Sequence, residues 1–210
     1  MTSTQSSLDD SPGLRPDDGA RADRRWGVVA LVTALLGFYG AATLVYERLQ
    51  LFLDAGHRTS CDINSWLSCG TVMRTPQAEA FGFPNPFIGI VAYAVVLAIA
   101  FAVLAGARFA AWYWWCVQIG VTLGWAFILW LWWQTTFEIN ALCLYCMLVW
   151  IMQTVLFVHT TARNLGAGVI PSRPAVARAA GSWAWFVSAA LLVLIFGTVF
   201  IRFAGVIFPA

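Results

Sequence analysis

Five long apolar segments alternate with polar segments along the chain. The apolar segments are residues 26–46, 87–107, 110–133, 141–161 and 183–201. An α-helix rises 1.5 Å per residue, so each segment is long enough to cross the roughly 30 Å hydrocarbon core of a bilayer. The first segment is longer than the ~7–15 apolar residues of a signal peptide and lacks a small-residue cleavage site, so we favour a retained helix over a cleaved leader. The pattern predicts five transmembrane helices.

The polar segments predict how these helices are connected. We interpret residues 1–25 as a disordered cytoplasmic tail, 47–85 as a long external loop and 163–182 as a cytoplasmic linker. The fifth transmembrane helix is expected over 183–203, followed by a short external tail at 204–210.

Arginine positions orient the chain, because short cytoplasmic segments of membrane proteins carry an excess of basic residues. An N-terminus in the cytoplasm puts more arginines inside than outside. Those inside are Arg15, Arg21, Arg24, Arg25, Arg108, Arg163, Arg173 and Arg178, and those outside are Arg48, Arg58, Arg74 and Arg202. We therefore expect a multi-pass plasma-membrane protein whose N-terminus is cytoplasmic and whose C-terminus and long loop are extracytoplasmic.

The composition agrees with an all-α integral membrane protein. Hydrophobic residues make up 60% of the 210 residues and charged residues only 10%, whereas soluble domains carry about 25% charged residues. A soluble enzyme and a disordered chain are therefore excluded. A net charge of +2 is too small for a nucleic-acid footprint. Within the third apolar segment, Gly120-x-x-x-Gly124 would permit close helix packing.

Two of the 5 cysteines lie at the start of the fourth apolar segment. Cys143 and Cys146 are three residues apart, which puts both sulfurs on one helix face within bonding reach. Asn140 is the expected N-cap, and Cys143 would then lie in the first helical turn, where the helix dipole favours a reactive thiolate. Cys146 would lie about one turn deeper, where it could meet a lipid-soluble electron acceptor.

Cys61 and Cys69 lie in the long loop, on the same side of the membrane as the helix pair. They are close enough in sequence to form a disulfide, and thiolate attack could link the two pairs. A four-thiolate zinc site and two static disulfides remain as alternatives to a redox relay. Cys116 is remote from these four and is interpreted as a small packing residue.

Together these features resemble the vitamin K epoxide reductase family, in its bacterial branch. The resemblance rests on Cys61-Asp62, the spacing to Cys69, the helix start Asn85-Pro-Phe-Ile-Gly89, and Cys143-Leu-Tyr-Cys146. It covers residues 26–161. It implies a catalytic unit over 26–162, formed by a four-helix bundle around a quinone site with the 47–85 loop as a lid, and a peripheral fifth transmembrane helix.

The resemblance also implies roles for single residues. Cys61 would exchange with a thioredoxin-fold partner, and Cys69 would attack Cys143. Cys146 would reduce the quinone and contact it.

Other residues keep two interpretations each. Asn85 would hydrogen-bond a quinone carbonyl or, alternatively, act as a helix N-cap before Pro86. Asp62 would organise the loop or stay a solvated charge. His57 is either a proton carrier or a solvated loop residue.

Two departures from the family shape the expected function. Many bacterial members continue into a fused thioredoxin-like domain, and this chain ends soon after the fifth helix, so a separate DsbA-like partner is expected. Animal members carry a tyrosine where this chain has Trp150. Trp150 keeps an aromatic wall beside the quinone but loses a hydroxyl, which casts doubt on vitamin K epoxide as substrate.

We therefore predict a thiol:quinone oxidoreductase that reoxidises this partner and passes its electrons to a menaquinone or ubiquinone. No metal is expected. The alternatives are a quinone or vitamin K epoxide reductase whose main product is the reduced quinone, and a non-catalytic scaffold held by zinc or disulfides.

Overall fold

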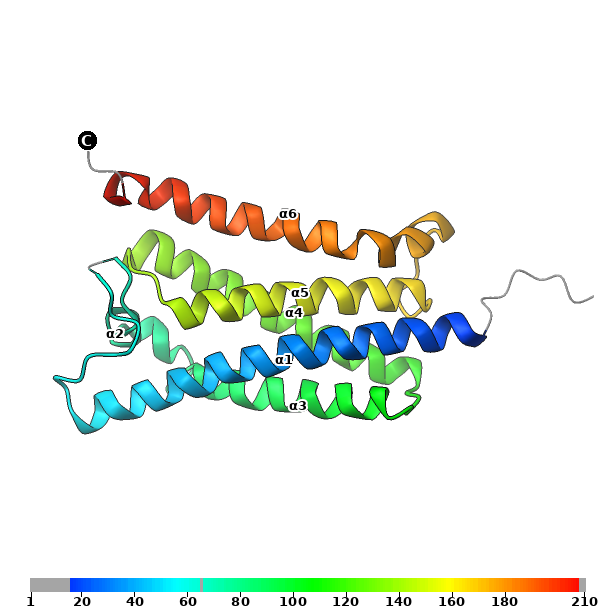
Figure 1. The fold of residues 1–210 in the computed structure, drawn as a ribbon, viewed down its shortest axis with the longest axis horizontal. Helices are drawn as coiled ribbons and strands as arrows, with labels where there is room; N and C mark the ends of the chain where they lie inside the picture. Colours follow the sequence, from blue (N-terminus) through cyan, green and yellow to red (C-terminus); the bar gives the residue numbers. More distant parts are fainter. Residues whose placement is uncertain (1–15, 65, 208–210) are drawn as a thin grey trace, which may run out of the picture.

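Long helices lie side by side along one axis of the molecule (Figure 1). The computed structural model describes residues 16–64 and 66–207, with side chains over 19–64 and 66–205. Its long helices are α1 (Pro16–Leu53), α3 (Pro86–Leu104), α4 (Ala111–Trp133), α5 (Leu144–Gly166) and α6 (Pro174–Ile207). The short elements are α2 (Cys69–Met73), the 3-10 helix η1 (Pro76–Glu79) and the π-helix η2 (Gln134–Ile139). Within the described residues, 5 helices are long and apolar enough to span a membrane, as predicted.

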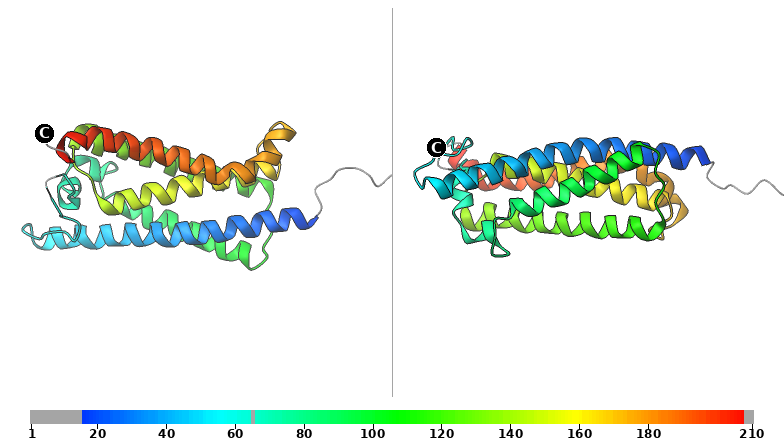
Figure 2. Two further views of the ribbon diagram at one scale, coloured as in Figure 1. Left: turned by 45° about the horizontal axis from the view of Figure 1, so that its top comes forward. Right: turned by 90° about the horizontal axis from the view of Figure 1, so that it is seen from below.

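Four of these helices form a bundle, and α6 lies on its outside. α1 packs against α3 and α5, whereas α4 and α6 each pack against α5 (Figures 1 and 2). A glycine allows α1 and α3 to approach closely, because a Cβ atom added at Gly37 would lie 2.4 Å from the ring of Tyr93. The expected all-α fold, a four-helix bundle with a peripheral fifth helix, is confirmed.

Of the glycine pair Gly120 and Gly124 in α4, only Gly124 lies where two helices pack closely. A Cβ at Gly124 would lie 2.7 Å from the side chain of Gln153 on α5, whereas one at Gly120 would meet open space. Cys116, on the same helix, is exposed to the surroundings. Its interpretation as a packing residue is therefore wrong, because it points away from the bundle toward the lipid.

Helix α1 is longer at both ends than its apolar segment. Residues 16–25, expected in a disordered tail, are helical, while residues 1–15 lie outside the described part. α1 also continues to Leu53, so the loop begins at residue 54 instead of 47. The apolar pattern marks only the part of a helix that crosses lipid, whereas the helix's own backbone hydrogen bonds continue it into water.

The later connections are also shorter than predicted. η2 continues α4 directly, so the helical structure extends over residues 134–139, beyond the apolar segment that ends at residue 133. α5 runs to Gly166 and α6 starts at Pro174, a residue suited to a first helical position, which reduces the linker from 163–182 to 167–173. α6 reaches Ile207, beyond the expected end at residue 203; residues 208–210 lie outside the described part.

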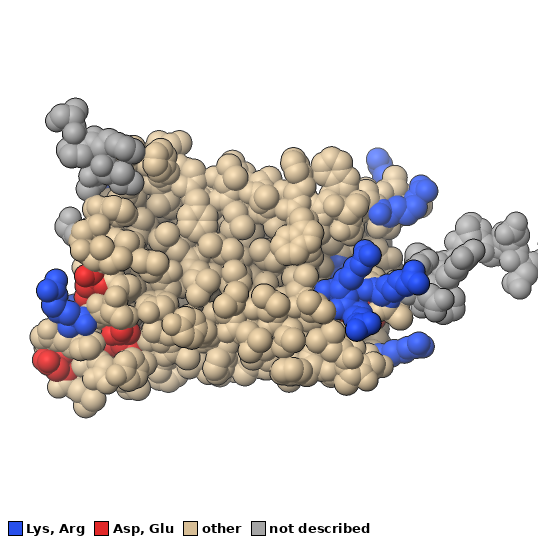
Figure 3. Space-filling view, in the orientation of Figure 1, with Lys and Arg blue, Asp and Glu red and all other residues tan. Residues whose placement is uncertain are grey.

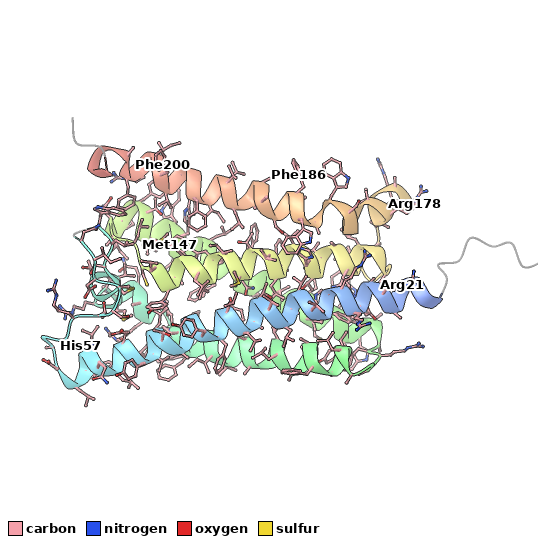
Figure 4. All side chains as sticks on the ribbon, viewed as in Figure 1. Arg21, His57, Met147, Arg178, Phe186 and Phe200 are labelled. Carbon is pink, nitrogen blue, oxygen red and sulfur yellow. A yellow bond between two sulfur atoms is a disulfide. The ribbon has the colours of Figure 1, made fainter. Side chains whose placement is uncertain are left out.

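The two ends of the bundle differ in charge. The loop end carries residues 54–85 and the start of α5, and Figure 4 labels His57 there. The arginine end carries the start of α1 and the α3–α4 and α5–α6 connections, and Figure 4 labels Arg21 and Arg178 there. Figure 3 shows acidic side chains at the loop end and arginines grouped at the other end. The described arginines of the arginine end are Arg21, Arg24, Arg25, Arg108, Arg163, Arg173 and Arg178.

Candidate active site

A short backbone pairing joins the loop to the start of α5. Leu67 and Leu142 form an isolated parallel β-bridge. The amide of Leu142 donates to the carbonyl of Trp66 at 2.8 Å, and the amide of Ser68 donates to the carbonyl of Leu142 at 2.9 Å. Two ladder hydrogen bonds fix the register of the paired segments. They align the residues that lead directly into Cys69 and Cys143.

Three sulfur atoms lie close together next to this bridge. Cys61 and Cys69 form a disulfide, and the Sγ atom of Cys69 lies 2.9 Å from the Sγ atom of Cys143. Cys69 and Cys143 are completely buried. Cys143 and Cys146 are free thiols. The structure therefore brings together the four cysteines selected from the sequence, with Cys69 in contact with the helix pair.

Cys143 itself caps α5. Its backbone is extended, and its Sγ atom accepts a hydrogen bond from the amide of Cys146 at 3.4 Å. The predicted cap, Asn140, instead has a left-handed backbone with φ of 55° and ends η2. The prediction for Asn140 is wrong because residues 141 and 142 must be extended to form the β-bridge, which delays the start of the helix.

Asp62 organises the loop around the disulfide. Its carboxylate accepts hydrogen bonds from the Thr59 amide at 2.9 Å, the Ser68 hydroxyl at 2.7 Å and the Gly70 amide at 3.0 Å. Burial opposes ionisation of this carboxyl, but the hydrogen bonds from Ser68, Gly70 and Thr59 prevail and lower the pKa of Asp62 to about 2. The loop-organising interpretation is therefore correct, and Asp62 is not simply a solvated charge.

A second acidic residue holds the segment that precedes Cys61. Glu47, on α1, is only 4% exposed. Its carboxylate accepts a hydrogen bond from the Ser60 amide at 3.0 Å and lies 3.0 Å from Nε2 of His57. His57 is thus paired with a buried carboxylate, so its interpretation as a solvated loop residue is wrong. Sequence reasoning missed Glu47 because the carboxylate and the loop meet only in the folded chain.

A cavity of about 150 Å³ lies between the helices next to Cys146. Residues of α1, α3, α4 and α5 line it, and Val72 and Met73 of α2 contribute to the wall. Most lining side chains are apolar, with a few polar groups such as Asn85 and Gln153. Apolar walls with a few placed polar groups are typical of sites for small organic molecules. Such a cavity, with a thiol on its wall, fits a quinone ring.

Asn85 and Trp150 both line this cavity. The Asn85 side chain donates to the Gln77 carbonyl at 2.7 Å and accepts from the Ala80 amide at 3.0 Å, and it makes no helix-cap hydrogen bond. Asn85 therefore occupies the N-cap position before Pro86, as the alternative expected, but its side chain does not cap the helix because Gln77 and Ala80 occupy its amide atoms. One amide hydrogen remains for a ligand. Trp150 is 1% exposed and packs against Phe196 of α6.

Tyr93 is a further cavity residue that sequence reasoning missed. Its side chain is 3% exposed, and its buried hydroxyl has no hydrogen-bond partner among the described residues. It lies on α3, four residues after Gly89 and eight residues after Asn85, which directly precedes the helix, and all three line the cavity. That periodicity marks one helix face and could have identified it. The side chain at position 150 provides no hydroxyl, whereas Tyr93 lines the same cavity and carries a buried one.

The sulfur cluster suits disulfide exchange better than metal binding. The three sulfurs of Cys61, Cys69 and Cys143 lie within 4.8 Å of one another. A metal ion requires free thiolates. Because two of the three sulfurs are bonded to each other, the arrangement presents an electrophilic disulfide to one thiol.

The family comparison covers the same part of the chain as this site. The model of the Vitamin K epoxide reductase family matches residues 28–161. The chain belongs to this family. The match extends from α1 to α5 and includes the loop, both cysteine pairs and the cavity. A comparison with curated proteins finds no significant match.

Membership in the vitamin K epoxide reductase family confirms the resemblance seen in the motifs. It supports a multi-pass membrane thiol oxidoreductase linked to a quinone. The geometry agrees with this class of activity, because a disulfide, a thiol pair and an apolar cavity follow one another in space.

Proposed function

We propose that this protein reoxidises a thioredoxin-fold, DsbA-like partner outside the cytoplasm and passes the electrons to a membrane quinone. The observation that carries the proposal is the 2.9 Å contact between the sulfurs of Cys69 and Cys143. It connects the loop disulfide to a second thiol, Cys146, on the wall of the apolar cavity.

The first exchange takes place at the loop disulfide. A thiolate of the reduced partner attacks Cys61, which forms a mixed disulfide and releases Cys69 as a thiolate. The second partner thiolate then attacks the partner's sulfur, so the partner leaves oxidised and Cys61 leaves as a thiol. Cys61 is buried, so the segment held by Glu47 must move aside for this attack.

The second exchange moves the electron pair to the helix cysteines. The Cys69 thiolate attacks Cys143 in a Cys143–Cys146 disulfide and releases the Cys146 thiolate. Cys61 then attacks Cys69, which re-forms the loop disulfide and releases Cys143. The structure matches the outcome of this step, with the loop pair bonded and the helix pair as free thiols.

The last step closes the cycle at the cavity. A quinone accepts two electrons and two protons, and Cys143 and Cys146 return to a disulfide. Asn85 keeps one amide hydrogen as a donor for the quinone, and Tyr93 and Trp150 form part of the cavity wall. The proposal covers menaquinone and ubiquinone types alike.

The distribution of arginines supports an extracytoplasmic loop end. At the loop end, Arg48 pairs with Glu79, Arg74 donates to the Ala55 carbonyl and Arg202 donates to Asn140. The arginine end has more arginines, and basic ends favour the cytoplasm. The thiol chemistry would then face the compartment in which disulfides persist.

Anaerobic quinone reduction by the purified protein tests the proposal. With a dithiol donor, the wild type and Cys116→Ala should turn over, because Cys116 faces away from the bundle. Cys146→Ala should reduce no quinone. A reduced DsbA-like protein as donor then tests the partner. Retained turnover in Cys146→Ala would contradict the electron path, and a wild type that binds quinone without turnover would favour the scaffold.

A further inference from the structure

Gln153 is a buried polar residue of α5 that the proposed electron path does not use. Its side chain is buried and lines the cavity, on the same face of α5 as Cys146 and Trp150. It lies about 10 Å further along the helix axis than Cys146, and it is the last residue of α5 in the cavity wall. Polar side chains within membrane helices are costly and often mark a substrate site.

The amide of Gln153 has a fixed orientation. Its Nε2 atom donates a hydrogen bond to the carbonyl of Val121 on α4 at 3.0 Å. A carbonyl can only accept, so this contact identifies which end of the amide faces α4. Gly124 leaves room for the amide, because a Cβ atom at this position would lie 2.7 Å from Nε2. The packing of α4 against α5 therefore also sets the position of the amide oxygen, Oε1.

This oxygen is an acceptor without a partner. Among the described residues, no group donates to Oε1 of Gln153, and this atom is not enclosed by protein. Other polar side chains of the cavity wall offer less. Arg48 and Trp150 carry only donors. The Asn85 oxygen already accepts from a backbone amide at the end of η1, and the Tyr93 hydroxyl is itself buried.

We propose that Gln153 recognises the reduced product, with its Oε1 atom accepting a hydrogen bond from a hydroxyl of the quinol. This inference rests on the proposed function, in which a quinone becomes a quinol in this cavity. A quinone carbonyl has no hydrogen to donate, so the bond forms only after reduction. Both redox forms can accept from an N–H group, so the amide oxygen is what distinguishes them. Gln153 therefore favours the quinol over the quinone.

Anaerobic binding of duroquinone and of its reduced form, duroquinol, to the purified full chain tests this role. All variants are made in a Cys146→Ala parent, so that no Cys146 thiol reduces the bound quinone. Gln153→Met keeps the length of the side chain and removes its oxygen. It should weaken duroquinol binding about fivefold, as expected for one hydrogen bond, and duroquinone binding less than about twofold. Titration calorimetry measures both dissociation constants.

Gly124→Ala is a second variant, and it keeps the glutamine. The added Cβ atom would displace the amide from its place beside α4. The preference for duroquinol over duroquinone should fall as it does in Gln153→Met. This variant decides the question if Gln153→Met fails to fold.

Gln118→Met is the matched control. Gln118 is as buried as Gln153 and also joins α4 to α5, through Thr161 and Asn164, but it is not part of the cavity wall. It should lower the unfolding temperature and leave the preference for duroquinol unchanged. An equal loss of preference in Gln118→Met would mean that helix packing alone is responsible, which overturns the proposal.

The remaining outcomes separate this role from the proposed function. A parent that binds neither form would refute the quinone site, and the role of Gln153 with it. A parent that binds duroquinone but shows no preference for duroquinol would leave the quinone site standing and overturn the role of Gln153. Equal weakening of both forms in Gln153→Met, or no weakening of either, would also overturn it.

Discussion

The two cysteine pairs share one buried cluster, but different contacts hold the segments around them. Hydrogen bonds to two carboxylates, Asp62 and Glu47, hold the loop pair and the segments around it. The helix pair is held by the start of α5 and by close packing of helices around the cavity. Polar contacts can open and close in water, whereas tight packing keeps one arrangement. The difference suits a loop that must meet a soluble partner and a thiol that must meet a membrane quinone.

Removing a single loop cysteine should give the largest difference between activity with the protein partner and activity with a small dithiol. Cys61→Ala should abolish oxidation of the protein partner and keep part of the quinone reduction driven by a small dithiol, which can reach the helix pair directly. Cys69→Ala should have the same pattern, because Cys69 contacts Cys143. Loss of a nucleophile costs orders of magnitude in rate. Steady-state assays with both donors measure the split, and equal loss with both donors would show that the loop pair has another role.

Adding one methyl group should disturb the packed region. Gly37→Ala places a Cβ atom 2.4 Å from the Tyr93 ring, and overpacking of this kind typically costs about 1–3 kcal/mol. We expect a lower unfolding temperature and weaker quinone binding, measured by thermal unfolding with and without quinone. Gly120→Ala is the control, because its Cβ would meet open space. Equal behaviour of the two variants would contradict the close contact between α1 and α3.

Asp62→Asn should loosen the loop and leave the packed region unchanged. An amide cannot replace a carboxylate that accepts from Thr59, Ser68 and Gly70. Hydrogen exchange at the amides of Thr59 and Gly70 should become faster, while exchange in α3 and α5 stays the same. Unchanged protection of both loop amides would mean that the β-bridge alone holds the loop.

The lowered pKa of Asp62 predicts how the stability of the same loop depends on pH. The pKa of Asp62, about 2, lies below the usual carboxyl value, so its stabilisation is fully present above that usual value. It is lost as the pH falls toward 2. Loop protection in the wild type, corrected for intrinsic exchange, should therefore stay constant between pH 5 and pH 8. A fall within that range would mean that a group other than Asp62 controls the loop.

The smallest expected effect comes from removing the buried hydroxyl of Tyr93. Tyr93→Phe removes a buried group that has no partner among the described residues, so the fold should be no less stable. If the hydroxyl donates to the quinone, the KM for quinone should rise about two- to tenfold, as expected for one hydrogen bond. Tyr46→Phe, at an exposed position of α1, is the control. An unchanged KM would remove Tyr93 from the site.

Much of the architecture could be predicted from the chain. The apolar segments located all five spans because a lipid environment demands about 20 consecutive apolar residues. The boundaries failed at residues 16–25 and 134–139, where helices continue beyond the hydrocarbon. The cysteine pairs were found because their spacing is unusual. The prediction of Asn140 as the N-cap of α5 was wrong because the β-bridge between Leu67 and Leu142 overrides the preference of asparagine for the N-cap position.

The sequence by itself determined that this is a membrane protein with five spans, two cysteine pairs and a family motif, because those properties are local in the chain. Tertiary structure alone decided which sulfurs touch. It also decided that the Glu47 carboxylate pairs with His57, that the buried hydroxyl of Tyr93 has no partner among the described residues, and that α6 leaves a groove beside α5. These contacts join residues far apart in sequence, and their geometry depends on how closely the helices pack.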